Sequence, residues 1–208
     1  MIEALGVPHT EIDLILVNGK SVDFNYILQD EDRVSVYPVF ESFNIANVAR
    51  LRKSPLRRPT FIADINLGDI VKYARILGLD VYYDPSLSTG EIIEISKRKN
   101  RVILTKSRKL LKFKDVTRGI FIWPGTTIEQ IRRIIDNLDI KSNIKPFSRC
   151  LCCNSLLKIV LKEKILDRIP PKTKTFYDEY VQCPSCDKIY WKGTHYMHME
   201  KVIKQILA

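Results

Sequence analysis

The chain has 208 residues, of which 45% are hydrophobic and 28% are charged, which suits a packed core and argues against a disordered chain. No apolar run approaches the roughly 20 residues that span a bilayer, and the first residues lack the pattern of a signal peptide. We therefore expect a cytoplasmic protein with no membrane partner.

The net charge of +10 is unevenly distributed along the chain. Residues 1–48 carry eight Asp or Glu and two Lys or Arg, a net charge of −6, whereas the rest carries 32 basic and 16 acidic residues, a net charge of +16. This reversal predicts two units with different surfaces. The basic part predicts a polyanionic partner, RNA or DNA, although a solvated lysine-rich surface is the alternative.

The segment 1–48 predicts a small α+β unit. Residues 11–17 alternate and then run apolar, which predicts a strand, and Asn18-Gly19 is typical of a hairpin turn. Further extended pieces are expected at 22–28 and 33–39. Residues 49–59 form a basic linker that is either a solvated tether or a strap on an RNA backbone, with candidate phosphate contacts at Arg50, Arg52, Lys53, Arg57 and Arg58.

Residues 60–146 alternate between strand and helix patterns. Strands are expected at 61–64, 80–83, 101–105 and 119–123, and helices at 67–77, 89–98 and 126–138. Thr89 is expected to cap the second helix, and Thr126 with Glu129 to form a capping box on the third. This pattern predicts a three-layer α/β domain with a mostly parallel sheet.

Three acids could bind Mg²⁺ or Mn²⁺ at the carboxyl ends of these strands, where parallel sheets place their chemistry. Asp64 and Asp84 each follow a strand, and Glu91 lies in the second helix. The alternative for Asp64 is a hydrogen-bonding acid at the start of a helix. The third strand is followed by cations and a hydroxyl instead of an acid, which favours phosphate binding by Lys106, Arg108, Lys109 and Lys112.

All five cysteines lie in the segment 147–208, which ends in an amphipathic helix expected at 196–207. Two C-x-x-C pairs predict one structural zinc ion, with an iron–sulfur cluster as the alternative, on Cys150, Cys153, Cys183 and Cys186. Cys152 is expected to be a spare thiol. His195 and His198 are expected to pack or bind phosphate, and Tyr190 and Trp191 either to stack bases or to belong to a core.

Four stretches resemble the C-terminal ribonuclease domain family named after the Mut-seven exonuclease: FIADINLGDIVKYARILGLDVYYD, RVILTKSRKLL, FSRCLCCNSL and VQCPSCDKIYWKGTHYMHM. The resemblance implies a PIN-like fold with a C-terminal zinc ribbon and a ribonuclease whose acids bind Mg²⁺ or Mn²⁺. The front, GVPHTEIDLILVNGKSVDF with DRVSVYPVFE, resembles the ubiquitin-like β-grasp domain often fused to this family, here short by its first hairpin.

Carried over residue by residue, the resemblance implies an altered centre. Asp64 matches the first family acid, but Thr89 and Ser107 stand where the second and third are expected. We therefore expect an RNA- or ribonucleoprotein-binding protein with a degenerate acidic centre, associated with ribosomes or tRNA. The alternatives are an active ribonuclease that uses Asp64, Asp84 and Glu91, and a protein-interaction scaffold. The acidic front unit is expected to contact a protein or to lie against the basic body.

Overall fold

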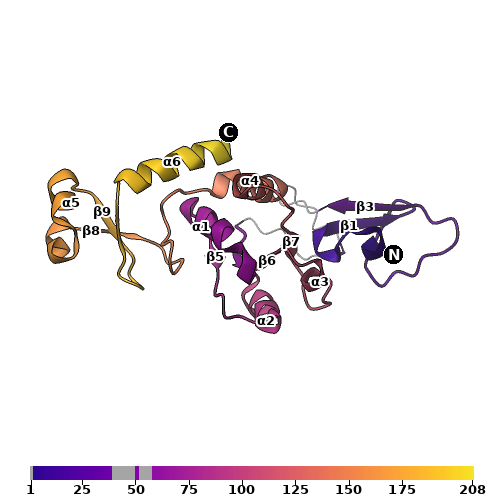
Figure 1. Ribbon diagram of the computed structural model, residues 1–208. Helices are drawn as coiled ribbons and strands as arrows, with labels where there is room; N and C mark the ends of the chain where they lie inside the picture. Colours follow the sequence, from indigo (N-terminus) through magenta and orange to yellow (C-terminus); the bar gives the residue numbers. More distant parts are fainter. Residues whose placement is uncertain (1, 39–49, 52–57) are drawn as a thin grey trace.

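The computed structural model describes residues 2–38, 50–51 and 58–208, which form three sheets and their helices (Figure 1). A four-stranded sheet with its helices lies in the middle, with the N-terminal sheet on one side and the C-terminal sheet on the other. No helix in these ranges is both long and apolar enough to cross a membrane.

The central sheet has the order β5-β4-β6-β7, and all its pairings are parallel. Its strands are β4 (Phe61–Ala63), β5 (Val81–Tyr82), β6 (Val102–Thr105) and β7 (Gly119–Phe121). The expected α/β domain with a parallel sheet is thus confirmed. Because all four strands run in one direction, the segments that follow them meet at a single edge of the sheet, which we call the carboxyl edge.

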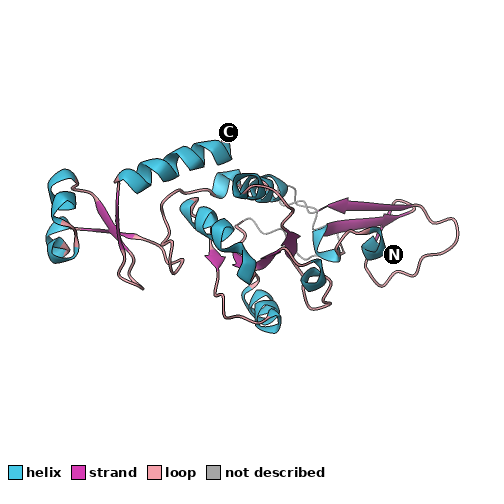
Figure 2. Cartoon of the chain, in the orientation of Figure 1, coloured by secondary structure: helices cyan, strands magenta, loops and turns pink. Residues whose placement is uncertain are grey.

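Helices cover both faces of this sheet (Figure 2). Side chains alternate along each strand, so Phe61 and Ala63 face one helical layer while Ile62 faces the other. The first layer contains α1 (Gly68–Ile76) and α4 (Thr127–Leu138), and the second contains α2 (Thr89–Lys99) and α3 (Arg108–Leu111). The two apolar clusters on either side of the sheet make this a three-layer arrangement.

Local capping explains where the helices begin. Thr126 and Glu129 form the expected capping box of α4. The expected cap of α2 was wrong by one residue, because the side chain of Ser88, not Thr89, accepts the Glu91 N–H and completes a capping box. The short helix α3 was not expected; the hydroxyl of Ser107 accepts the Leu110 N–H and starts it.

The N-terminal sheet is antiparallel with the order β2-β1-β3, formed by β1 (Ile12–Val17), β2 (Lys20–Val22) and β3 (Val34–Pro38). Asn18 and Gly19 both have positive φ, 51° and 78°, as the expected hairpin turn requires. The extended piece expected at 22–28 was wrong beyond Val22, because Asp23 accepts the Asn25 N–H in a turn. Residue 39, the end of the third expected piece, lies outside the described residues.

This N-terminal sheet is joined to the exposed edge of the central sheet through the short 3₁₀ helix His9–Glu11. The Glu11 carboxylate accepts the N–H of Phe121 in edge strand β7 at 3.3 Å, and His9 Nε2 lies 2.8 Å from the Val116 carbonyl oxygen. One backbone N–H of β7 and one carbonyl of the segment just before it thus gain partners. The acidic front unit therefore lies against the basic body, as one of the two expectations for it stated.

The C-terminal sheet is antiparallel with the order β10-β9-β8, formed by β8 (Lys158–Val160), β9 (Tyr180–Gln182) and β10 (Ile189–Trp191). Helix α5 (Pro171–Phe176) lies between β8 and β9 in sequence and was not expected. The final helix, α6 (Thr194–Leu207), begins two residues before the expected 196 and returns over α4 (Figure 1). Its Val202, Ile203 and Ile206 join the first layer's apolar cluster.

Two charged side chains, Arg75 and Asp80, hold the loop 150–155, which we call the first cysteine loop, on the α/β domain. The Arg75 side chain, in a residue only 4% exposed, donates to the carbonyl oxygen of Val81 and, at 2.9 and 2.8 Å, to those of Leu151 and Cys152. Beside it, Asp80 accepts from side chains of both parts of the chain at 2.6 to 3.1 Å, namely Arg101, Arg149 and Asn154. A buried guanidinium is tolerated when carbonyl groups replace its hydration.

We expect Asp80→Asn to lower the free energy of unfolding by about 2–3 kcal/mol, because it leaves two half-buried guanidinium groups without their carboxylate. Burial would raise the pKa of Asp80, but hydrogen bonds from Arg101 and Asn154, with the nearby charges, lower it overall. Its stabilisation is thus full above the unfolded pKa of about 3.9 and is lost as the pH falls through the lower folded pKa. Urea unfolding followed by circular dichroism measures both effects.

The matched control is Asp115→Asn, which removes an ion pair with Lys97 whose side chains are 65% and 69% exposed. Such a pair contributes only about 0–1 kcal/mol. Equal small losses in the two variants would show that the Asp80 cluster does not stabilise the junction.

Candidate functional site

The carboxyl edge of the central sheet brings together several of the predicted site residues. Asp64 follows β4 directly, Asp84 follows β5, and Lys106 and Ser107 follow β6. Since β5, β4 and β6 are parallel neighbours, these residues share one edge of the sheet. This edge is the candidate site.

Both carboxylate oxygens of Asp64 accept hydrogen bonds within the protein. Oδ1 accepts the Ile65 N–H at 2.7 Å, and Oδ2 accepts the hydroxyl of the fully buried Thr105 at 2.7 Å. The Thr105 oxygen in turn accepts the Ser107 N–H at 2.9 Å. Asp64 thus acts as the N-cap of the turn that precedes α1 and connects the ends of β4 and β6.

The other two predicted acids are bound to their own local segments. Asp84 accepts the N–H and hydroxyl of Ser86 at 2.9 and 2.6 Å, and Glu91 accepts those of Ser88 at 2.8 and 2.6 Å. These hydrogen bonds lower the pKa of both carboxyl groups. Across the described residues, the ligand-type groups within 4.8 Å of one another are four cysteines, so Asp64, Asp84 and Glu91 do not form a comparable group.

Cations surround the acid-poor end of β6. The side chains of Lys106, Arg108, Lys109 and Lys112 are all exposed. The Arg108 guanidinium carbon lies 4.9 Å from the ring centroid of Phe121 and 5.0 Å from that of Trp123. In the linker, Arg50 and Arg58 are exposed, whereas the predicted contacts Arg52, Lys53 and Arg57 lie outside the described residues. The positive charge is therefore concentrated beside Ser107.

The predicted metal ligands lie on two equivalent loops. Cys150 donates its N–H to the Ser155 carbonyl and accepts the Asn154 N–H, and Cys183 makes the same two bonds with Lys188 and Asp187. The fifth residue of each loop has a positive φ, 69° at Asn154 and 58° at Asp187. Each C-x-x-C pair thus turns tightly enough to direct two sulfur atoms at one point.

The four sulfur atoms of Cys150, Cys153, Cys183 and Cys186 lie within 4.8 Å of one another. Sulfurs from opposite loops approach to 3.3 and 3.5 Å, close to the ~3.8 Å expected around a zinc ion with Zn–S distances of about 2.3 Å. Burial would raise the pKa of Cys150, but hydrogen bonds from the Tyr190 hydroxyl and two backbone N–H groups lower it overall. The donor set can therefore bind a metal such as zinc.

Neighbouring side chains have supporting roles in this cluster. The Tyr190 hydroxyl lies 3.1 Å from the Cys150 sulfur and accepts the Leu151 N–H. The Tyr190 residue is half-buried. Trp191 packs on the apolar cluster of Ile165, Ile169 and Tyr180. Cys152 lies outside the four-sulfur group and accepts from Lys188 Nζ at 2.8 Å. The core alternative thus fits both aromatic residues better than base stacking.

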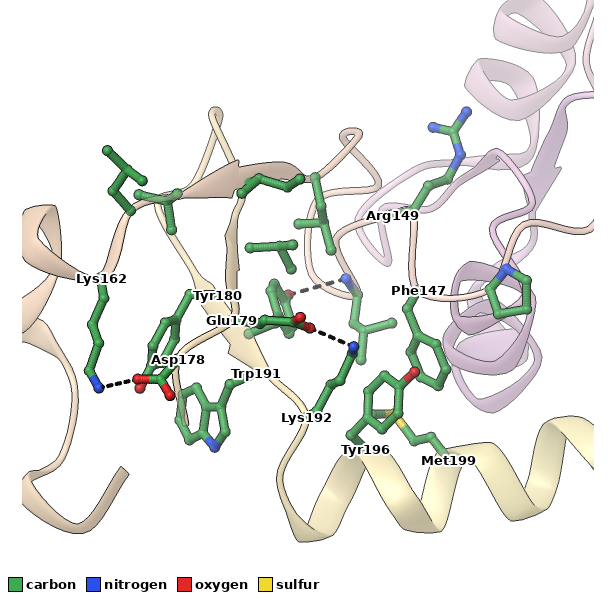
Figure 3. A pocket seen from close by; sticks show the side chains of 18 of the residues that line it. Phe147, Arg149, Lys162, Asp178, Glu179, Tyr180, Trp191, Lys192, Tyr196 and Met199 are labelled. Carbon is green, nitrogen blue, oxygen red and sulfur yellow. Dashed lines mark hydrogen bonds and ion pairs between the residues drawn. The ribbon is translucent and has the colours of Figure 1, made fainter. Parts of the chain in front are cut away.

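An apolar groove of about 700 Å³ lies between the C-terminal sheet and α6 (Figure 3). The Phe147 and Tyr196 rings stack at its α6 end, with centroids 4.1 Å apart. Its lysines are paired: Lys162 with Asp178 at 2.7 Å and Lys192 with Glu179 at 2.6 Å. Its arginine, Arg149, pairs with Asp80. The groove therefore offers little unpaired positive charge for phosphate.

The sequence pattern missed two residues that matter at these sites. Asp80 is the first residue of the strand expected at 80–83, a position that gives no sign of a role, yet it joins both cysteine-loop and sheet residues. Trp123 stands two residues after β7 and therefore lies at the carboxyl edge. It is the last residue of the strand expected at 119–123, as Asp64 is of the strand expected at 61–64, so its position at a strand end could have identified it.

Comparison with protein families agrees with this architecture. The Mut7-C RNAse domain family matches residues 59–203, and the Mut7-C ubiquitin family matches residues 1–44. No curated protein and no solved structure was found to match the chain. Both matches confirm the family and the ubiquitin-like front that the sequence motifs predicted. The chain therefore belongs to the Mut7-C RNAse domain family.

Proposed function

We propose that this protein binds RNA at the carboxyl edge of a PIN-like sheet whose acidic centre is degenerate, and that a C-terminal zinc ribbon stabilises the fold. The observation that carries the proposal is the state of Asp64. Both of its oxygens accept protein hydrogen bonds, the end of the neighbouring strand β6 presents Ser107 between Lys106 and Arg108 where the third acid is expected, and Thr89 stands where the second is expected.

The charge at this edge favours phosphate over a divalent ion. Mg²⁺ and Mn²⁺ are bound through carboxylate and other oxygen ligands, and removing carboxylates weakens both the binding and the activation of water. The exposed cations beside Ser107 repel a metal ion and attract the phosphates of RNA. Binding at this edge thus needs no metal, whereas cleavage does.

A second candidate, an active Mg²⁺- or Mn²⁺-dependent ribonuclease, is favoured by a different observation. Asp84 precedes α2 and Glu91 lies in its first turn, near the carboxyl edge; hydrogen bonds from Ser88 lower the pKa of Glu91 overall, while burial and the charge of Asp84 oppose its ionisation. A metal ion would relieve this repulsion. In this candidate Asp64, Asp84 and Glu91 would hold the ion, which would supply the activated water.

The zinc ribbon follows from the closed donor set. Four thiolates complete a tetrahedron and leave no position for a catalytic water, so the ion would serve folding. The C-terminal sheet has an apolar cluster of only three buried residues, Ile165, Ile169 and Tyr180, which suits a unit that depends on metal for stability. Ribosomes and tRNA remain our proposed RNA partners, and the cytoplasm the proposed location.

We expect the affinity for single-stranded RNA to fall steeply with salt, with a slope of about −0.7 in log–log form per phosphate neutralised. The double variant Lys106→Gln/Lys109→Gln should weaken binding and reduce the magnitude of this slope by about 1.4, measured by fluorescence anisotropy. Lys201→Gln, an exposed lysine on α6, is the control and should change neither. A salt-independent Kd would contradict the proposed surface.

Cleavage of a labelled structured RNA in Mn²⁺ separates the two candidates. We expect little or no cleavage by the wild type and no further loss in Asp64→Asn, because too few carboxylates gather at the edge. Strong cleavage that Asp64→Asn abolishes by about 100-fold or more would establish the ribonuclease instead. The thermal unfolding of the variant confirms that it remains folded.

The purified chain should contain one zinc per molecule, measured by elemental mass spectrometry. Cys183→Ser should lose the metal and unfold the C-terminal sheet, because removing one thiolate opens the tetrahedron. Cys152→Ser is the matched control and should retain the metal, since its sulfur lies outside the group. Visible absorption and bound iron in place of zinc would show a cluster of a different kind.

A further inference from the structure

An aromatic corner with a cation in it lies at the carboxyl edge, beyond the residues already assigned. Trp123 is 47% exposed and stands two residues after β7. Its ring meets that of Phe121 edge-on, with centroids 5.1 Å apart and an interplanar angle of 87°. The Arg108 guanidinium lies about equally close to both rings, at 4.9 and 5.0 Å. We call these three side chains the Trp123 platform.

Hydrogen bonds hold the backbone at both aromatic residues of the platform. The Trp123 carbonyl accepts a hydrogen bond at 2.8 Å from the side chain of Gln130, a residue of α4 that is only 7% exposed. Phe121 belongs to β7, and its N–H is bound by Glu11 of the N-terminal unit. These hydrogen bonds fix the backbone that carries the two rings, so less conformational entropy is lost when a ligand stacks on the exposed Trp123 ring.

The surroundings of the platform select the kind of ligand. Lys106 and Lys109 flank Arg108 and are exposed. The acid near this corner is Glu11, whose pKa is raised by burial, while the Phe121 N–H and the nearby Arg108 lower it. A guanidinium stacked on an aromatic ring keeps N–H donors around its perimeter that can bind phosphate. An exposed aromatic face beside cations is the pattern that single-stranded nucleic acid recognises.

We propose that the exposed face of Trp123 stacks one base of single-stranded RNA while Arg108 binds the adjacent phosphate. This inference rests on the proposed RNA binding and assigns a specific base subsite to it. Trp123 lies two strands from Asp64 in the order β4-β6-β7, a separation of about 10 Å at the usual strand spacing. The subsite would therefore place the RNA backbone along the cations toward Asp64. Stacking of this kind accepts any base, so it gives affinity with little sequence preference.

The chain offers a direct spectroscopic test because it has two tryptophans, Trp123 and Trp191. In Trp191→Phe, all indole emission comes from Trp123, and titration with a uridine oligonucleotide should quench it strongly. In Trp123→Phe, the emission comes from Trp191, which packs in the apolar cluster of the C-terminal sheet, and the same titration should change it little. Trp123→Phe keeps a ring and so should retain most of the affinity.

Affinity measurements provide the second readout. Trp123→Leu should raise the Kd for the uridine oligonucleotide by about 5- to 100-fold, the range that base–aromatic stacking gives. The same variant should leave the Kd for an abasic oligonucleotide of equal length unchanged, because that ligand has the phosphates but no base. Because Trp123 is half exposed, Trp123→Leu should fold. If Trp123→Leu does not fold, the quenching measured in Trp191→Phe still tests the inference.

The outcomes separate this inference from the function on which it rests. Salt-dependent RNA binding with no Trp123 quenching and an unchanged Kd in Trp123→Leu would overturn the base subsite and leave RNA binding intact. An equal loss of affinity for the uridine and abasic oligonucleotides would also overturn it, since that pattern requires only charge. A wild type that binds neither oligonucleotide would overturn the proposed function itself.

Discussion

The buried guanidinium of Arg75 is the contact on which the placement of the cysteine-bearing C-terminal part against the central α/β domain depends. It comes from α1, and all four hydrogen bonds that it donates end on backbone carbonyls, two on Val81 of β5 and two on the first cysteine loop. No other side chain could make them all, because only arginine carries five donors in a rigid plane. Asn154 of the same loop donates to Asp80, and its side-chain oxygen accepts the Val81 N–H. The first cysteine loop and the central sheet therefore share one polar core.

This shared core explains why a small cysteine-bearing sheet can be placed firmly beside an α/β domain. The loop from Cys150 is fixed at its backbone by Arg75, while α6 returns the chain to α4 and adds Val202, Ile203 and Ile206 to the domain's apolar cluster. The C-terminal sheet itself contributes little apolar burial to that cluster. The C-terminal part is thus attached to the α/β domain by directional hydrogen bonds at the first cysteine loop and by apolar burial at α6.

The sequence predicted the regular parts of this structure because they follow local periodicity. The alternating faces of β4 and the capping box at Thr126 depend on residues within one strand or one turn, so they can be predicted from the sequence alone. The errors have the opposite origin. Asp80 looked like an ordinary strand start, because its partners Arg149 and Asn154 lie about 70 residues away along the chain. The shift of the α2 cap from Thr89 to Ser88 reflects two adjacent hydroxyl residues that the local pattern cannot rank.

The candidate site was predicted in position but not in its details, for a physical reason. Parallel topology alone brings the ends of β4, β5 and β6 to one edge, so the location followed once the strands were recognised. Whether an acid there binds a metal or a hydroxyl depends on its neighbours across the sheet. Thr105, fully buried on the neighbouring strand, donates a hydrogen bond to one oxygen of Asp64 and accepts one from the Ser107 N–H. The Ser107 N–H, and not its side chain, belongs to this chain of hydrogen bonds, so the Ser107 hydroxyl is left to accept the Leu110 N–H and start α3. The absence of an acid between Lys106 and Arg108, and the exposed cations on both sides of Ser107, therefore suit the proposed binding of phosphate at this edge.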